Sequence, residues 1–138
     1  IYIVWCRYRT KQPEFWRYDP IEDKWNYSMN TSDLSTGAFR NGAALAWDGY
    51  DGCIYAMMGS RSHKNGTRFA RYNCSSNLWE NLTMPESWKN KTDDGASLVW
   101  TGREYLYALQ GEIGERKPHK PITNFSRIIF LPLAGEAE

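Results

Sequence analysis

Three short sequence patterns recur along this chain at a spacing of about 52–56 residues, and this repeat constrains the fold more than any other feature. The pattern GAALAW of residues 42–47 returns as GASLVW at residues 95–100. The pattern IYAMMG of residues 54–59 returns as LYALQG at residues 106–111 and, more loosely, as IYIVWC at residues 1–6. Repeats of this length indicate supersecondary units that stack or are arranged radially, because one unit alone cannot bury its apolar faces.

The third pattern is the longest of the three. FARYNCSSNLW at residues 69–79 corresponds to FWRYDPIEDKW at residues 15–25, with Phe, Arg, Tyr and Trp at identical offsets. Its first half recurs weakly as FSRIIF at residues 125–130. Residues 42–82 hold each pattern once, so this segment is the complete copy of the unit.

The apolar and aromatic runs inside these patterns predict β-strands, because they are short and end at turn signals. The expected strands cover residues 1–5, 15–18, 24–27, 43–47, 54–58, 69–72, 78–82, 96–100, 105–110 and 125–131. A turn is expected at residues 19–23, where Asp caps its own backbone and Pro presets φ. The Asp-Gly pairs at 48–49 and 51–52 predict a hairpin turn. No helix-period segment with caps is present.

The composition narrows the classes of partner. Aromatic residues make up 15 % of the chain, with seven Trp and nine Tyr, which suits half-buried strands. The net charge is +1 and both signs are interspersed, so no charge pattern favours nucleic acid. No apolar run approaches the roughly 20 residues of a membrane-spanning helix, and we expect no membrane span. The chain lacks an initiator Met and starts inside a strand pattern, which suggests a processed chain or a fragment.

Together the three patterns resemble kelch-type repeats, and the resemblance covers nearly the whole chain. Its most specific part is the Tyr-Asp-Pro segment with Trp at the fixed offset in residues 18–25, matched by Tyr and Trp at the same spacing in residues 72–79. The chain departs from the family at the paired glycine after the second strand, which is reduced to Gly-Ser at 59–60 and Gly-Glu at 111–112. In the first copy Cys-Arg replaces it at residues 6–7.

The resemblance implies an all-β fold made of kelch-like β-propeller blades, each with four antiparallel strands. The chain would supply about two and a half blades and an incomplete ring. Residues 1–30 would form strands two to four of a first blade, residues 42–83 a complete blade, residues 95–133 strands one to three of a third blade, and residues 134–138 a tail. Propellers close with four to eight blades. The chain is therefore either part of a longer polypeptide or completed by identical copies, because unpaired edges are templates for further strands.

N-glycosylation is the strongest functional signal. Seven of the nine asparagines begin an N-x-S/T triplet without Pro, namely Asn26, Asn30, Asn65, Asn73, Asn81, Asn90 and Asn124. Ser and Thr make up 18 of 138 residues, so chance would give about one such asparagine. The alternative is that Asn, Ser and Thr simply share turns. The excess predicts a protein of the secretory pathway, the cell exterior or an archaeal cell surface.

The three cysteines suggest one disulfide. Cys53 opens the second strand of the complete unit and Cys74 follows its third strand, so antiparallel pairing would bring these ends together. The alternative is two separate small apolar residues. Cys6 is then an unpaired thiol with a lost partner, an intermolecular bond or a buried site.

No catalytic or metal site and no cofactor are predicted. His63 and His119 fall in corresponding loops, and they could form a metal or acid–base pair, but no ligand cluster surrounds them and solvated loop positions are favoured. Two carboxylates among residues 93–94, Glu112 and Glu115 could cleave glycosides if held roughly 5–10 Å apart. Kelch-like propellers include copper-radical oxidases that need a constellation of Tyr, Cys and two His ligands, and the arrangement of these residues in this chain does not reproduce it.

The tryptophans divide into two groups. Trp47 matches Trp100 and Trp25 matches Trp79, whereas Trp5, Trp16 and Trp88 break the repeat. The matched rings predict packing between units. A repeat-breaking ring could stack on a sugar, but core packing or an interface is favoured.

The expected function is therefore an extracellular N-glycosylated structural or binding module on a β-propeller scaffold. Its partners would be N-linked glycans and a protein, further copies of itself or the missing blades, and not nucleic acid. The alternatives are a fragment of a carbohydrate-active propeller enzyme and a subunit of a self-assembling surface layer or filament.

Overall fold

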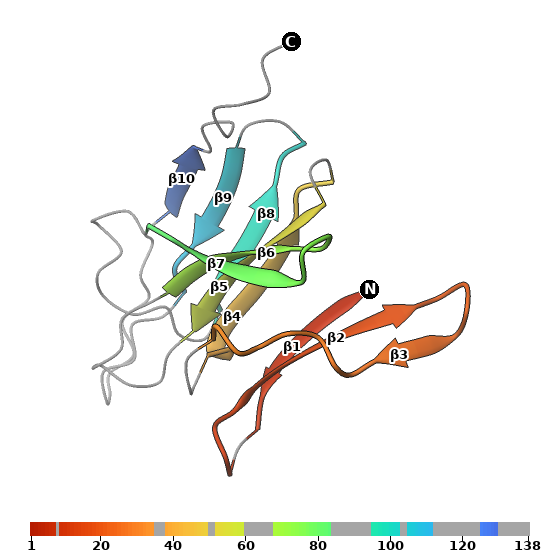
Figure 1. The fold of residues 1–138 in the computed structure, drawn as a ribbon. Helices are drawn as coiled ribbons and strands as arrows, with labels where there is room; N and C mark the ends of the chain where they lie inside the picture. Colours follow the sequence, from red (N-terminus) through yellow and green to blue (C-terminus); the bar gives the residue numbers. More distant parts are fainter. Residues whose placement is uncertain are drawn as a thin grey trace.

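The computed structural model describes residues 1–7, 9–34, 38–49, 52–59, 68–83, 95–102, 105–111 and 125–129. All regular structure in this part of the chain is β-strand (Figure 1). The strands are β1 (Tyr2–Cys6), β2 (Pro13–Asp19), β3 (Lys24–Asn26), β4 (Arg40–Trp47), β5 (Cys53–Gly59), β6 (Arg68–Asn73), β7 (Leu78–Leu82), β8 (Ser97–Trp100), β9 (Tyr105–Leu109) and β10 (Phe125–Ile129). Each strand expected from the sequence overlaps one of these ten.

The described strands form three antiparallel sheets. The first sheet has the order β1-β2-β3, the second β4-β5-β6-β7 and the third β8-β9-β10. Every pair of hydrogen-bonded neighbours is also consecutive in the chain, so each sheet is a simple meander. The expectation of an all-β chain with antiparallel strands is confirmed.

Turn chemistry fixes the hairpins. Oδ1 of Asp19 accepts the backbone N–H groups of Ile21 at 3.0 Å and Glu22 at 3.3 Å, which closes the expected turn between β2 and β3. Between β4 and β5, Gly49 and Gly52 have φ values of 70° and 71°, a region that glycine enters at little cost. Asp48 donates its backbone N–H to the carbonyl of Cys53 at 3.4 Å across this turn.

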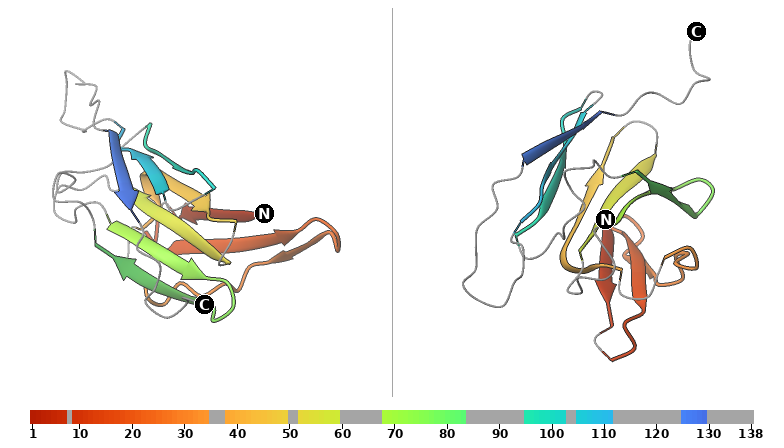
Figure 2. Two further views of the ribbon diagram at one scale, coloured as in Figure 1. Left: turned by 90° about the horizontal axis from the view of Figure 1, so that it is seen from above. Right: turned by 90° about the vertical axis from the view of Figure 1, so that its left-hand side faces the viewer.

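The second sheet lies between the other two, as the right-hand view of Figure 2 shows. Successive residues of a strand point to opposite faces. Ile54, Ala56 and Met58 of β5 therefore pack in a core cluster shared with the first sheet. Tyr55 and Met57 pack in a second cluster shared with the third sheet. Because both its faces are covered, β5 is buried along its whole length.

Edge strands of neighbouring sheets also approach one another. β4 is an edge strand of the second sheet, and it contacts β8, an edge strand of the third. Small side chains at Ala44 and Ala46 of β4 pack against the third sheet, which allows this close approach. Among the described residues no helix is long and apolar enough to cross a membrane.

Candidate functional site

The outer face of the first sheet carries a cluster of five aromatic side chains and one isoleucine, and no other sheet covers it in the described part of the chain. We call this surface the open face; its residues are Ile3, Trp5, Trp16, Tyr18, Trp25 and Tyr27. Strand alternation explains the cluster. In the first sheet Tyr2, Val4 and Phe15 point to the second sheet, so the intervening residues point away from it.

Trp16 is the centre of the open face. Its ring centroid lies 5.0 Å from that of Tyr27, 5.5 Å from that of Trp5 and 6.2 Å from that of Trp25, all in edge-to-face arrangements. Trp25 is also 4.9 Å from Tyr18, its register partner on β2. Aromatic pairs at these separations attract each other beyond their buried area. The cluster is thus pre-organised although it is exposed.

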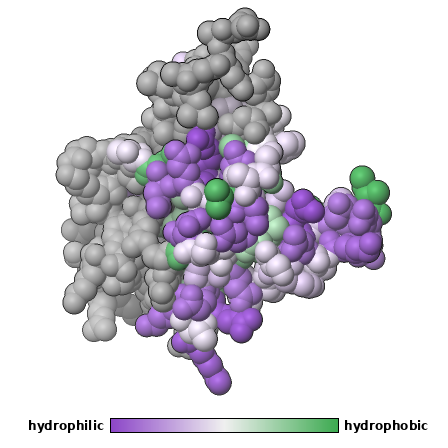
Figure 3. All heavy atoms as spheres, viewed as in Figure 1, coloured by the Kyte–Doolittle hydropathy of each residue, from purple (hydrophilic) through white to green (hydrophobic). Residues whose placement is uncertain are grey.

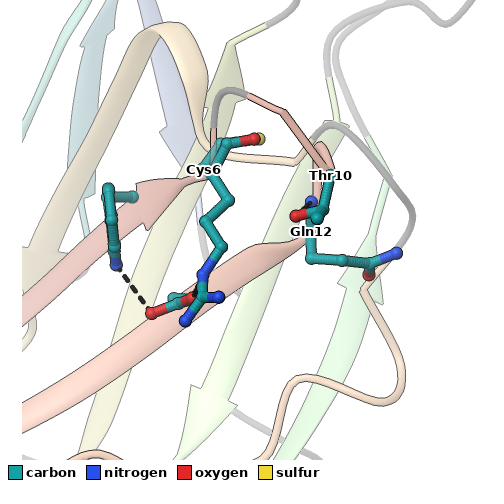
Figure 4. Close-up of polar contacts among 6 residues, drawn as sticks. Cys6, Thr10 and Gln12 are labelled. Carbon is teal, nitrogen blue, oxygen red and sulfur yellow. Dashed lines mark hydrogen bonds and ion pairs between the residues drawn. The ribbon is translucent and has the colours of Figure 1, made fainter.

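A charged group anchors one end of the open face, close to the β1–β2 hairpin loop in Figure 4, where Cys6, Thr10 and Gln12 are labelled. The Glu14 carboxylate accepts a hydrogen bond of 3.0 Å from Nε1 of Trp5 and forms an ion pair with the Arg7 guanidinium. The hydrogen bond fixes the edge of the Trp5 ring, and the ion pair with Arg7 positions the carboxylate that accepts it. In the hairpin loop, Gln12 donates its backbone N–H to Oγ1 of Thr10 at 3.4 Å.

A groove of about 390 Å³ lies beside this end of the face. Its lining residues are Arg7, Pro13, Glu14, Phe15, Trp16, Tyr27, Met29 and Thr31. Aromatic rings next to a carboxylate and a guanidinium suit either a sugar ring or the rim of a protein interface.

A tyrosine–turn hydrogen bond recurs in the first two sheets. The Tyr18 hydroxyl donates to Oδ1 of Asp23 at 2.7 Å, and the Tyr72 hydroxyl donates to Oδ1 of Asn77 at 2.6 Å. Asp23 and Asn77 have φ values of 51° and 57°, which Asp and Asn tolerate better than most residues. The hydrogen bond to Asp23 raises the pKa of Tyr18, and burial raises the pKa of Tyr72 to about 12.

The second turn also fastens the connection that leaves the first sheet. Asn30 donates its backbone N–H to Oδ1 of Asn77 at 3.2 Å and its Nδ2 amide to the carbonyl of Asn77 at 3.0 Å. The carbonyl of Asn30 accepts a hydrogen bond of 2.9 Å from Nε1 of Trp79. Three hydrogen bonds therefore join two segments 47–49 residues apart in the chain.

Four of the seven predicted acceptor asparagines lie in the described part of the chain. Asn26, Asn73 and Asn81 are exposed, and Asn30 is half-buried. Oδ1 of Asn26 accepts the N–H of Ser28 at 2.9 Å, and Oδ1 of Asn73 accepts the N–H of Ser75 at 2.9 Å. Asn65, Asn90 and Asn124 lie outside the described residues.

All three cysteines are thiols in the structure. Cys53 packs in the cluster between the second and third sheets, whereas Cys74 packs against the cluster on the opposite face, where its Sγ accepts a 3.5 Å hydrogen bond from the Tyr2 hydroxyl. The strand ends do meet, since Cys53 pairs with Asn73 in the register. A disulfide between opposite faces would require the backbone to move, and the pairing stays a prediction. Cys6 lies half-buried at the end of β1.

The residues considered for catalysis all lie outside the described part of the chain: His63, His119, residues 93–94, Glu112 and Glu115. Within the described residues no group of three or more His, Cys, Asp or Glu side chains could hold a metal ion.

No protein-family model matches this chain, and no curated protein matches its sequence.

Two features of the site went beyond the sequence-based expectations. The open face was not foreseen as one cluster, although Trp5 and Trp16 were singled out because they break the repeat. The tyrosine–turn bond was also missed. A signal was present, because an Asp or Asn follows each of Tyr18 and Tyr72 by five residues.

Proposed function

We propose that the chain is an N-glycosylated structural or binding module of an extracellular or cell-surface protein, built from kelch-like propeller blades. The exposed acceptor asparagines carry this proposal. Asn26 and Asn73 use Oδ1 to close their own turns, and Nδ2, the atom that carries an N-linked glycan, makes no hydrogen bond to the described residues. A glycan on either nitrogen would extend from an exposed residue without breaking a hydrogen bond to the described residues.

The arrangement of the sheets supports the propeller part of the proposal. The second sheet has the four antiparallel strands of a blade in chain order, and neighbouring sheets stack face to face. The approach of β4 to β8 agrees with first strands that converge around an axis, as in the kelch-like arrangement. The small residues at the start of the second and third units, at positions 42–44 and 95–97, fit such convergence.

The test is production in a eukaryotic secretory host, followed by intact-mass measurement before and after N-glycosidase treatment. We expect the mass to fall on treatment, and glycopeptide mapping to place glycans at Asn26 and Asn73. Gln substitutions at these two positions should each remove one glycan. The matched control is Asn41→Gln, because Asn41 begins no acceptor triplet. An unshifted mass would remove the argument for an extracellular location.

A second candidate, self-assembly into a layer or filament, is favoured by one specific observation. The open face presents Trp5, Trp25 and Tyr27 to solvent, although exposed aromatic clusters of this kind are typical of interfaces. A fragment of a carbohydrate-active enzyme remains the other alternative. The carboxylates considered for its acid pair lie outside the described residues, and kinetic assays on glycoside substrates would detect the activity.

A further inference from the structure

Neighbouring sheets in this chain pack through the same two faces each time. We call forward face the side chains that a sheet presents to the next sheet along the chain. In the first sheet these include Tyr2, Val4 and Phe15, and in the second they include Tyr55, Met57 and Phe69. The two sets occupy matching places in the repeat: residues 2, 4 and 15 correspond to residues 55, 57 and 69.

The opposite side of each sheet, the rear face, receives the sheet before it. In the second sheet the rear face includes Ile54, Ala56, Met58, Tyr72 and Trp79. In the third sheet it includes Leu106 and Ala108, which match Ile54 and Ala56 in the repeat. One forward face on one rear face is therefore the packing rule at both contacts between sheets.

By this rule the open face is the rear face of the first sheet. Tyr18 and Trp25 match Tyr72 and Trp79 in the repeat, and they form the same ring pair across neighbouring strands. The difference is coverage. Trp79 is 8 % exposed beneath the first sheet, whereas Trp25 is 40 % exposed. The open face thus has the composition of a buried contact surface without the sheet that covers one.

The third sheet has the complementary surface, and no other described sheet covers it. Val99, Tyr107 and Leu109 match Ala46, Tyr55 and Met57 in the repeat, so they form its forward face. Val99 is 58 % exposed and Leu109 is 38 % exposed, whereas Ala46 and Met57 are 9 % and 1 % exposed. The described chain therefore ends in a forward face on one side and a rear face on the other.

We propose that the forward face of the third sheet packs on the open face of a second copy of this chain. A second copy fits because this contact would continue the two contacts inside the chain: each copy carries the matching Tyr-x-apolar pair at Tyr107 and Leu109. Burial of exposed Trp and Tyr rings is the typical source of stability in such interfaces. This inference deepens the proposed structural role and rests on the sheet stacking invoked there, but it does not require glycans.

The experiment uses two blocked variants of the whole chain. Ile3→Glu places a charge on the open face, and Val99→Glu places one on the forward face of the third sheet. Light scattering and sedimentation velocity should show that the mass of the wild-type assembly increases with protein concentration beyond that of a dimer. Each variant alone should stay monomeric, because every contact would include a blocked face. An equimolar mixture should form a dimer and nothing larger, because one good pair of faces remains.

The matched control is Ile21→Glu, the same substitution at a turn residue that is 94 % exposed and outside both faces. Figure 3 shows a strongly apolar group at the tip of the β2–β3 hairpin, far from the rest of the sheets. This variant should associate like the wild type. Each blocked variant should weaken self-association by about tenfold or more, the usual effect of losing a central contact residue.

Circular dichroism and thermal unfolding will show whether each variant is folded. If Ile3→Glu does not fold, Trp25→Ala tests the same face by removing an exposed ring. A wild-type chain that stays monomeric at all concentrations overturns the proposal. This result is expected if a further sheet of the same polypeptide covers the open face. So does a mixture of folded variants that fails to dimerise.

The measurements are made on secreted protein before and after N-glycosidase treatment. If the secreted protein associates but its mass does not fall on treatment, the glycosylated module is rejected and the interface is kept. A glycosylated monomer would have the opposite meaning.

Discussion

The hydroxyl of Tyr72 donates a hydrogen bond of 2.6 Å to Oδ1 of Asn77 across the turn between β6 and β7. The same Oδ1 also accepts the backbone N–H of Asn30, which lies on the connection from the preceding sheet. One side chain thus joins a strand, a turn and a segment distant in the sequence. In the first sheet Tyr18 and Asp23 form the corresponding bond with a carboxylate as the acceptor.

Asn77→Ala should reduce the free energy of unfolding by about 1–3 kcal/mol, because it leaves buried or half-buried donors without an acceptor. It also places a residue without a polar side chain at a φ of 57°. Asn77→Asp is the matched variant, since Asp occupies the same place in the first sheet and keeps the acceptor. Urea unfolding monitored by fluorescence measures both. Equal losses in the two variants would contradict a role for the Oδ1 acceptor.

The pH dependence of stability should include a contribution from Tyr72. Burial raises the pKa of its phenol from an ordinary value of 10.0 to about 12, so the folded chain holds this proton where the unfolded chain releases it. The contribution is complete below pH 10 and is lost as the pH rises towards 12. Ultraviolet absorbance should show a late tyrosinate step that Tyr72→Phe lacks. A titration unchanged by this substitution would place the step elsewhere.

Two isoleucines offer the same substitution in covered and uncovered places. Ile54 is 2 % exposed between the first and second sheets, and Ile54→Ala should cost about 2–5 kcal/mol through lost burial and a cavity. Ile3 is exposed on the open face, and Ile3→Ala should cost less than about 1 kcal/mol in dilute monomer. Denaturant unfolding at low protein concentration compares them. Similar costs would mean that the open face is covered within the chain.

Glycan occupancy should differ between two neighbouring acceptors. Nδ2 of Asn30 donates to the Asn77 carbonyl at 3.0 Å, so a glycan would compete with a tertiary contact. Nδ2 of Asn26 has no such contact in the described part of the chain. Glycopeptide mapping should therefore find Asn26 occupied more often than Asn30. Full and equal occupancy would show that the Asn30 contacts form after, or in spite of, modification.

The same pair can be compared without glycans. Asn30→Gln should lower the free energy of unfolding by about 1–3 kcal/mol, because it displaces the amide from the β6–β7 turn. Asn26→Gln should change it by less than about 0.5 kcal/mol, as is usual at exposed positions. Unglycosylated protein and denaturant unfolding give both values. A neutral Asn30→Gln variant would deny the amide its structural role.

Local chemistry made the strands predictable. Turn residues such as Asp19 and Gly52 mark hairpin ends by their own backbone preferences, and short apolar runs between such turns leave little alternative to strands. The predicted start of β4 was less accurate. It was expected at residue 43 and begins at Arg40, because a register shift between Arg40 and Ala44 extends the pairing in a way that alternation does not reveal.

Side-chain direction was the information that the sequence reasoning used least. The proximity of the Cys53 and Cys74 strand ends was foreseen, and the register confirms it. The faces follow from counting one residue further: Asn73 is opposite Cys53, so Cys74 points to the other side of the sheet. The open face needed knowledge of which neighbouring sheet covers which face, and that is a tertiary property.

The unlike faces of these sheets limit the symmetry of the assembly that we propose. A two-fold symmetric dimer brings one surface patch against an identical patch, whereas the proposed contact, like those between the sheets within the chain, joins a forward face to a rear face. Such contacts are heterologous. A row of copies therefore keeps an unpaired forward face at one end and an unpaired rear face at the other. The rotation from one copy to the next then decides the outcome. If a whole number of these rotations makes a full turn and the copies return to the starting point, the assembly closes into a ring. Otherwise it forms an open helical filament with a defined polarity.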